Sequence, residues 1–98
     1  MVFIGGLSIA FSAQEKKHNY LPANGYVPDA KTAIKIAVAV WSPIYGEKQI
    51  QNKKPYKARL NKDIWIVDGS LPKGSPGGVP EAEISKQDGR IIRISHGK

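Results

Sequence analysis

Residues 28–46, PDAKTAIKIAVAVWSPIYG, decide the fold. After Asp29, apolar side chains recur at steps of four, three, four and three positions, at Ala30, Ile34, Ala37, Trp41 and Ile44. Because an α-helix turns once in about 3.6 residues, these side chains share one helical face. Asp29 is the expected N-cap, since its carboxylate accepts hydrogen bonds from the first turn. Pro43 either ends the helix near Ser42 or kinks its last turn, and Gly46 is a natural stop.

After Gly46 the hydrophobic period changes from helical to two. Apolar and polar residues alternate in four stretches, which are residues 56–60, 64–67, 81–85 and 92–95. Such alternation is typical of strands with one buried face. The sequence therefore predicts an α+β fold, with one long N-terminal helix packed on a curved antiparallel β-meander.

The connections between these stretches differ in character. Asn61-Lys62 and Gln87-Asp88-Gly89 are the expected tight turns, and an Asp-Gly pair is a strong hairpin signal. Residues 71–80, LPKGSPGGVP, contain three prolines and three glycines and are too irregular for a tight turn. Residues 47–52 leave two possibilities open: an additional edge strand or no strand.

The composition indicates one small domain with a binding function. The chain has 98 residues, no cysteine, 41% hydrophobic residues and a formal net charge of +7. Without cysteine there is no disulfide, thiolate nucleophile or cysteine-based zinc site. His18 and His96 are the only histidines and lie at opposite ends of the sequence, so a metal cluster or a catalytic triad has little to build on. We expect no enzyme activity, no metal and no cofactor.

Residues 1–13, MVFIGGLSIAFSA, carry no charged side chain. The run is shorter than the roughly 20 residues that span a bilayer, so we expect no stable membrane insertion. It matches the core of a secretory signal, complete or truncated, with Ala10 and Ser12 at positions −3 and −1. The usual preceding basic stretch is missing, and a buried N-terminal strand or helix is the alternative. The expected organisation is a signal segment at 1–13, a polar lead-in at 14–26 and one α+β domain at 27–98.

Six bases and no acid lie between positions 48 and 62, at Lys48, Lys53, Lys54, Lys57, Arg59 and Lys62. Three interpretations stay open: an edge strand protected by lysines, a surface for an acidic protein, and a nucleic-acid site. A nucleic-acid site needs several stacking aromatic residues, and Tyr56 alone stands among these bases. We therefore expect no nucleic-acid partner.

The sequence does not determine the surroundings of two features, Trp65 and the pair of Glu81 and Glu83. Trp65 lies on the opposite strand face from Ile64 and Ile66, so it lines an open face if the helix covers the isoleucines and is buried if the helix covers Trp65 instead. Glu81 and Glu83 share one strand face, as an acid/base pair or, more simply, as part of a solvated face.

A series of landmarks in residues 25–98 carries a family resemblance. They are Trp41-x-Pro43-x-Tyr45-Gly46, Trp65-x-Val67-x-Gly69-x-Leu71, Gly77-Gly78-Val79-Pro80 followed by Glu81 and Glu83, and Asp88-Gly89. In this order and spacing the chain resembles the NTF2-fold immunity proteins of bacterial polymorphic toxin systems. The resemblance implies a reduced NTF2-like or cystatin-like fold and a protein that protects the producing cell by binding a cognate toxin.

Two functions are compatible with these features. The first is an exported immunity protein that occludes its toxin with the 71–80 loop and the adjacent strand surface. The second is an NTF2-like domain that binds or converts a small ligand in a concave pocket around Trp65. The candidate partner-binding residues are Lys73, Pro76, Gly77, Gly78, Glu81, Glu83 and Trp65. The sequence leaves the oligomeric state undetermined.

Export gives the first testable prediction. If residues 1–13 are a signal, the mature protein begins near Ala13 or Gln14 and is periplasmic or secreted. If they are not, the protein is cytoplasmic. Mass spectrometry of fractionated cells that express the natural gene distinguishes the two, and an intact Met1 in the cytoplasmic fraction contradicts export.

Overall fold

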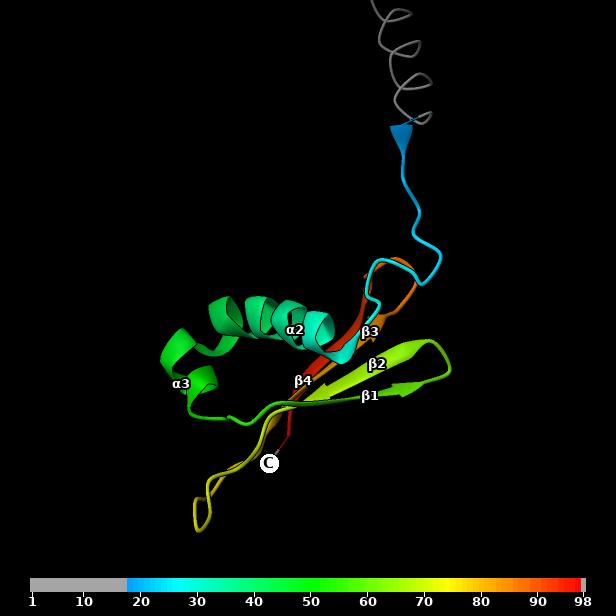
Figure 1. Cartoon of the computed structure of the whole chain (residues 1–98). Coiled ribbons are helices and arrows are strands. Elements are labelled where there is room, and N and C mark those ends of the chain that lie inside the picture. Colours follow the sequence, from blue (N-terminus) through cyan, green and yellow to red (C-terminus); the bar gives the residue numbers. More distant parts are fainter. Residues whose placement is uncertain (1–17, 98) are drawn as a thin grey trace, which may run out of the picture.

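The computed structural model describes residues 18–97, with one long helix laid across a four-stranded antiparallel sheet (Figure 1). Its elements are α2 (Ala30–Tyr45), α3 (Glu47–Gln51), β1 (Lys57–Asn61), β2 (Ile64–Asp68), β3 (Pro80–Ser85) and β4 (Ile91–His96). Each strand pairs with its neighbour in sequence, in the order β1-β2-β3-β4. The predicted α+β meander is thereby confirmed. The expected signal segment lies outside the described residues.

The start of α2 follows the expected capping. The Asp29 carboxylate accepts a hydrogen bond from the backbone N–H of Thr32 at 2.8 Å. Pro43 lies inside the helix and does not end it, because the helix continues to Tyr45. The Gly46 N–H then donates to the Ser42 carbonyl at 2.8 Å, so Gly46 is the stop.

The buried face of α2 consists of Ala33, Ala37 and Trp41. The two small alanines let the helix backbone approach the sheet closely at one end. The large Trp41 ring fills a wider gap at the other end. Ile44, expected on this face, is 57% exposed. That expectation is wrong because Ile44 belongs to the last turn of α2, which extends past Trp41, the last buried residue of the helix.

The helix covers the sheet face that carries Trp65 and Val67. Their cross-strand partners on β3, Ile84 and Ala82, are buried on the same face. Of the two arrangements that the sequence left open for Trp65, the structure adopts the buried one. Within the described residues no helix is both long and apolar enough to cross a bilayer.

Residues 47–51 form a short helix, α3, so the additional edge strand is not formed. Ile50 is fully buried, and its carbonyl accepts a hydrogen bond from the Tyr56 hydroxyl at 2.7 Å. The Tyr56 ring lies 6.0 Å from the Trp41 ring. These contacts hold α3 against the end of α2.

The end of the lead-in docks on the hairpin between β3 and β4. The N–H groups of Tyr26 and Val27 donate to the carbonyls of Gln87 and Lys86 at 2.9 and 3.0 Å. Val27 is buried, and its carbonyl accepts a hydrogen bond from Trp65 Nε1 at 2.8 Å. These residues therefore complete the core where the helix begins.

The two tight turns both use the left-handed backbone region. The β1–β2 turn is Lys62-Asp63, one residue later than expected, with φ of 49° and 65°. In the β3–β4 turn Gly89 has φ of 75° and donates its N–H to the Ser85 carbonyl at 2.9 Å. The second turn therefore needs glycine, as the Asp-Gly signal predicts.

The second prediction concerns this glycine. Gly89→Val should lower the free energy of unfolding by roughly 1 kcal/mol or more, because a β-branched residue is strained at positive φ. Thermal or urea unfolding followed by circular dichroism measures the change. An unchanged midpoint would show that the turn tolerates a side chain and does not need its left-handed conformation.

Candidate functional site

The 71–80 loop projects away from the helix-covered sheet, at the opposite end of the strands from the two tight turns (Figure 1). Within it, Lys73, Pro76 and Gly77 are exposed and Gly78 is half-buried. An internal turn is closed by the Ser75 N–H, which donates to the Pro72 carbonyl at 3.0 Å. The structure thus brings together four of the candidate residues on one projecting segment.

Three hydrogen bonds fix the base of this loop. The Gly69 N–H donates to the Pro80 carbonyl at 3.0 Å, and the Gly97 N–H donates to the Val79 carbonyl at 3.1 Å. Lys53 Nζ donates to the Gly78 carbonyl at 3.0 Å. The loop is therefore tied to β2, to the end of β4 and to the segment before β1, while its tip stays exposed.

Glu81 and Glu83 lie directly after the loop, on the sheet face that points away from α2. Arg93 of β4 lies close to both carboxylates, with its guanidinium nitrogen 2.6 Å from Glu81 and 3.9 Å from Glu83. The Arg93 guanidinium thus forms ion pairs with both carboxylates. This geometry suits a solvated, ion-paired strand face better than a proton-transferring pair.

Asp68 extends this acidic group and was missed by the sequence analysis. It is the direct cross-strand partner of Glu81, a proximity that follows from the strand register and not from any local motif. Burial, and next the neighbouring Glu81 carboxyl, raise the pKa of Asp68, while Arg59 and Lys57 act in the opposite direction. Asp68 therefore takes up a proton at a higher pH than an isolated aspartate would.

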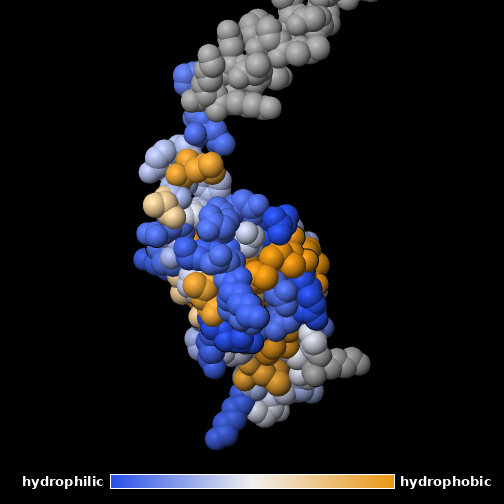
Figure 2. Space-filling model, turned by 90° about the vertical axis from the view of Figure 1, so that its right-hand side faces the viewer, coloured by the Kyte–Doolittle hydropathy of each residue, from blue (hydrophilic) through white to orange (hydrophobic). Residues whose placement is uncertain are grey.

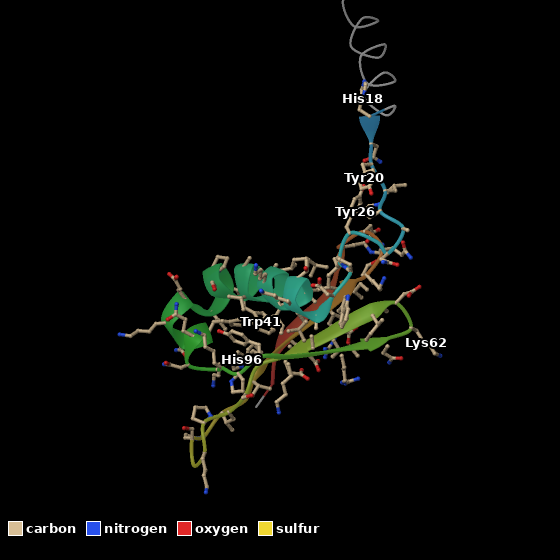
Figure 3. All side chains as sticks on the ribbon, in the orientation of Figure 1. His18, Tyr20, Tyr26, Trp41, Lys62 and His96 are labelled. Carbon is tan, nitrogen blue, oxygen red and sulfur yellow. The ribbon has the colours of Figure 1, made fainter. Side chains whose placement is uncertain are left out.

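Trp65 does not join the other candidate residues. It is 8% exposed, and the hydrogen bond from its indole N–H to Val27 satisfies its only polar atom. Trp41 points from α2 toward the sheet (Figure 3), and its indole N–H reaches the Glu81 carbonyl at 3.3 Å. The space in which a pocket around Trp65 was expected is occupied by core side chains, so Trp65 acts as a core residue here.

The six bases of residues 48–62 are distributed along one side of the domain and do not converge. Lys57 and Arg59 stand on the outer face of β1, whereas Lys62 lies at the far tip of the β1–β2 turn (Figure 3). Lys53 is half-buried and is engaged with the loop. This distribution supports the interpretation of a lysine-protected edge strand.

Histidines and acids do not gather into a metal centre in the part of the chain that the structure describes. His18 lies in the lead-in, far from His96 at the end of β4 (Figure 3). His96 instead stacks edge-on against Tyr45, with ring centres 4.9 Å apart. Among residues 18–97 no group of three or more potential ligands is placed to hold a metal ion.

Comparison with known proteins agrees with this architecture. The sequence model of the family described as NTF2 fold immunity protein matches residues 32–98. The chain is 33% identical over 73 residues to the uncharacterized protein YhhH of Escherichia coli strain K12, a match that covers 74% of this chain and 58% of YhhH. It is 38% identical over 55 residues to the uncharacterized protein YbbC of the same strain, over 55% of this chain and 45% of YbbC.

The chain spans about half the length of these curated relatives. No solved structure matches it significantly. The family match alone extends over well more than half of the sequence and includes most of α2, all four strands and the projecting loop. The chain therefore belongs to the NTF2 fold immunity protein family.

Proposed function

We propose that this chain neutralises a bacterial protein toxin by binding it, with the 71–80 loop and the adjoining outer face of β3 as the contact surface. The proposal includes no catalytic step. The observation that carries it is the loop itself, whose base is tied to three parts of the domain while its tip is exposed. A segment held in this way presents side chains to a partner without weakening the core.

The loop is preorganised for binding by its prolines and its anchors. Pro72, Pro76 and Pro80 restrict the backbone of the free protein, and the Lys53–Gly78 hydrogen bond fixes one end of the exposed tip. A restricted loop loses less conformational entropy on binding than a flexible loop of equal length. Affinity then depends on the contacts themselves and not on ordering the segment.

Charge contributes mainly to the speed of association. Lys73 is exposed at the loop tip, and the chain as a whole has a formal net charge of +7. A basic tip steers the protein toward an acidic surface on the toxin, and added salt weakens the effect. Glu81 and Glu83 are already paired with Arg93, so their role in the contact is to offer oriented carboxylates and not unpaired charge.

We place this activity in the periplasm. The support is the uncharged residues 1–13 with Ala10 and Ser12 at the expected cleavage positions, all of which lie outside the described residues.

The third prediction tests the loop. Replacing residues 73–78 with a short glycine-serine linker should abolish most protection in a survival assay in which the variant and the toxin encoded beside it are expressed together. The fold should persist, because the replaced residues contribute no buried side chain. Circular dichroism and the unfolding midpoint check this.

A matched pair of single substitutions separates the loop from overall charge. Lys73→Glu and Lys62→Glu make the same change in net charge at exposed sites at opposite ends of the sheet. Lys73→Glu should slow association with the toxin, most strongly at low salt, whereas Lys62→Glu should have little effect.

Full protection by the folded loop replacement would exclude this loop as the inhibitory element.

A further inference from the structure

The two edges of the sheet differ in how they are protected. β1 and β4 are the outer strands, and an unprotected outer strand is a template for pairing with another chain. β1 carries Lys57 and Arg59 on its outer face, with Lys62 directly after it. The only formal charge within β4 is Arg93, which is paired with the glutamates of the neighbouring strand, and Arg90 directly before β4 is paired with Asp88. β4 is therefore the edge on which no unpaired charge opposes pairing with another strand.

Apolar side chains flank this open edge. Ile91 and Ile92 are each 39% exposed, and Ile94 packs against the core while remaining only partly buried. The main contacts of α2 with the sheet are with β1, β2 and β3, which leaves β4 at the margin of the covered face. Figure 2, viewed from the end of the β1–β2 turn, shows several hydrophobic areas between hydrophilic side chains, one of them along a flank of the domain.

The hydrogen-bond ladder determines which backbone groups point outward from β4. The Pro80 carbonyl points to β2 and accepts a hydrogen bond from the Gly69 N–H. The Val79 carbonyl points to β4 and accepts a hydrogen bond from the Gly97 N–H. Because backbone groups alternate along a strand, Arg93 and Ser95 direct their N–H and C=O groups to β3. Ile94 and His96 consequently direct theirs to the open side.

We propose that two copies of this chain associate through β4, as an antiparallel pair of strands centred on Ile94. In this register the two Ile94 residues exchange both backbone hydrogen bonds, and their side chains meet on the apolar face. Arg93 then stands opposite Ser95 of the second copy on the outer face. A pairing centred on Arg93 would instead place two guanidinium groups directly opposite each other.

Charges on the outer face complement one another in the Ile94 register. Glu81 is the cross-strand partner of Ser95, and Glu83 is the partner of Arg93. In the joined sheet, Ser95 of one copy therefore lies between its own Glu81 and Arg93 of the second copy. Beyond that Arg93 lies Glu83 of the second copy. Small Ser95 leaves the Arg93 guanidinium room between carboxylates from both copies, and the same row is repeated by the two-fold symmetry.

The other edge fails the same test. A pairing of β1 with itself over its full length is centred on Arg59 and opposes that guanidinium to its own copy. If the centre is displaced to Ala58, Lys57 of each copy stands directly opposite Arg59 of the other copy. Like charges directly opposite are destabilising in an antiparallel pair. A pairing centred on Leu60 avoids facing like charges but is confined to residues 59–61, because β1 ends at Asn61 and the turn follows at Lys62. Self-association is thus directed to β4.

This association leaves the projecting loop of each copy free. The 71–80 loop emerges at the end of β3 that lies beside the end of β4, as the Gly97–Val79 hydrogen bond shows. Antiparallel pairing places the loops of the two copies at opposite ends of the joined sheet. Both loops stay accessible, and the dimer contact meets the proposed inhibitory surface only at Glu81 and Glu83, which face Arg93 on the outer side of the sheet.

The fourth prediction is measured on the full chain by sedimentation velocity over a range of protein concentrations, without any toxin. The wild-type chain should shift from monomer to dimer as concentration rises. Ile94→Lys should weaken dimerisation by about tenfold or more, since it introduces two facing ammonium groups at the centre of the pair. Leu60→Lys is the matched control: Leu60 is 47% exposed on β1, and its substitution should leave the dimer unchanged.

A second pair of variants avoids reliance on a substitution that weakens folding. Because the chain has no cysteine, Ile94→Cys and Leu60→Cys each introduce a single thiol. Facing residues in a hydrogen-bonded antiparallel pair have Cα atoms about 5.5 Å apart, within the range that a disulfide bridges. Under mild oxidation Ile94→Cys should form a covalent dimer, and Leu60→Cys should remain monomeric.

Three results would overturn the proposal: a wild-type chain that stays monomeric throughout, a dimer that Ile94→Lys leaves intact, or equal cross-linking of the two cysteine variants. A monomer whose Ile94→Lys variant also loses protection would assign the β4 edge to the toxin and not to a second copy. Loss of dimerisation with full protection would leave the proposed function standing, so the two proposals fail separately.

Discussion

The fold depends on placing two buried tryptophans so that each indole N–H finds an acceptor. Trp41 joins α2 to the Glu81 carbonyl on β3, and Trp65 joins β2 to the Val27 carbonyl in the lead-in. A buried donor without a partner costs about 1–3 kcal/mol, a large share of the stability of a domain of this size. The helix, the central strands and the lead-in are therefore fixed relative to one another by two side chains, around which the alanines of α2 allow close packing.

This constraint also sets the base of the proposed contact surface. The carbonyl that Trp41 engages belongs to Glu81, the first residue of β3 after Pro80, so the point where the projecting loop re-enters the sheet is held from beneath by the core. Lys53 and Gly97 hold the same region from either side. The exposed tip thus stands on an end of the sheet that several hydrogen bonds fix, so the proposed contact segment can keep its conformation without a partner.

Local patterns predicted the helix, the strands and the hairpin glycine because each is encoded by neighbouring residues. They did not identify the covered face of β2, since Ile64 and Ile66 are as apolar as Trp65 and Val67, and only packing against α2 decides between them. The helix at 47–51 was equally hidden, because it has 5 residues and only one buried side chain, Ile50, which is too little to show a helical period. Asp68 beside Glu81 depends on strand register, and the exposure of Ile44 depends on how far α2 extends past the sheet.

The meander order has a consequence for how such a protein diversifies. Every strand pairs with its sequence neighbour, so the 71–80 segment closes a connection between adjacent strands and passes through no other part of the domain. The entropy of closing a flexible connection grows only logarithmically with its length, by about 0.6 kcal/mol for each doubling. Insertions and deletions in the exposed tip are therefore nearly neutral for folding, so the proposed contact segment can change in sequence and length while the scaffold stays the same.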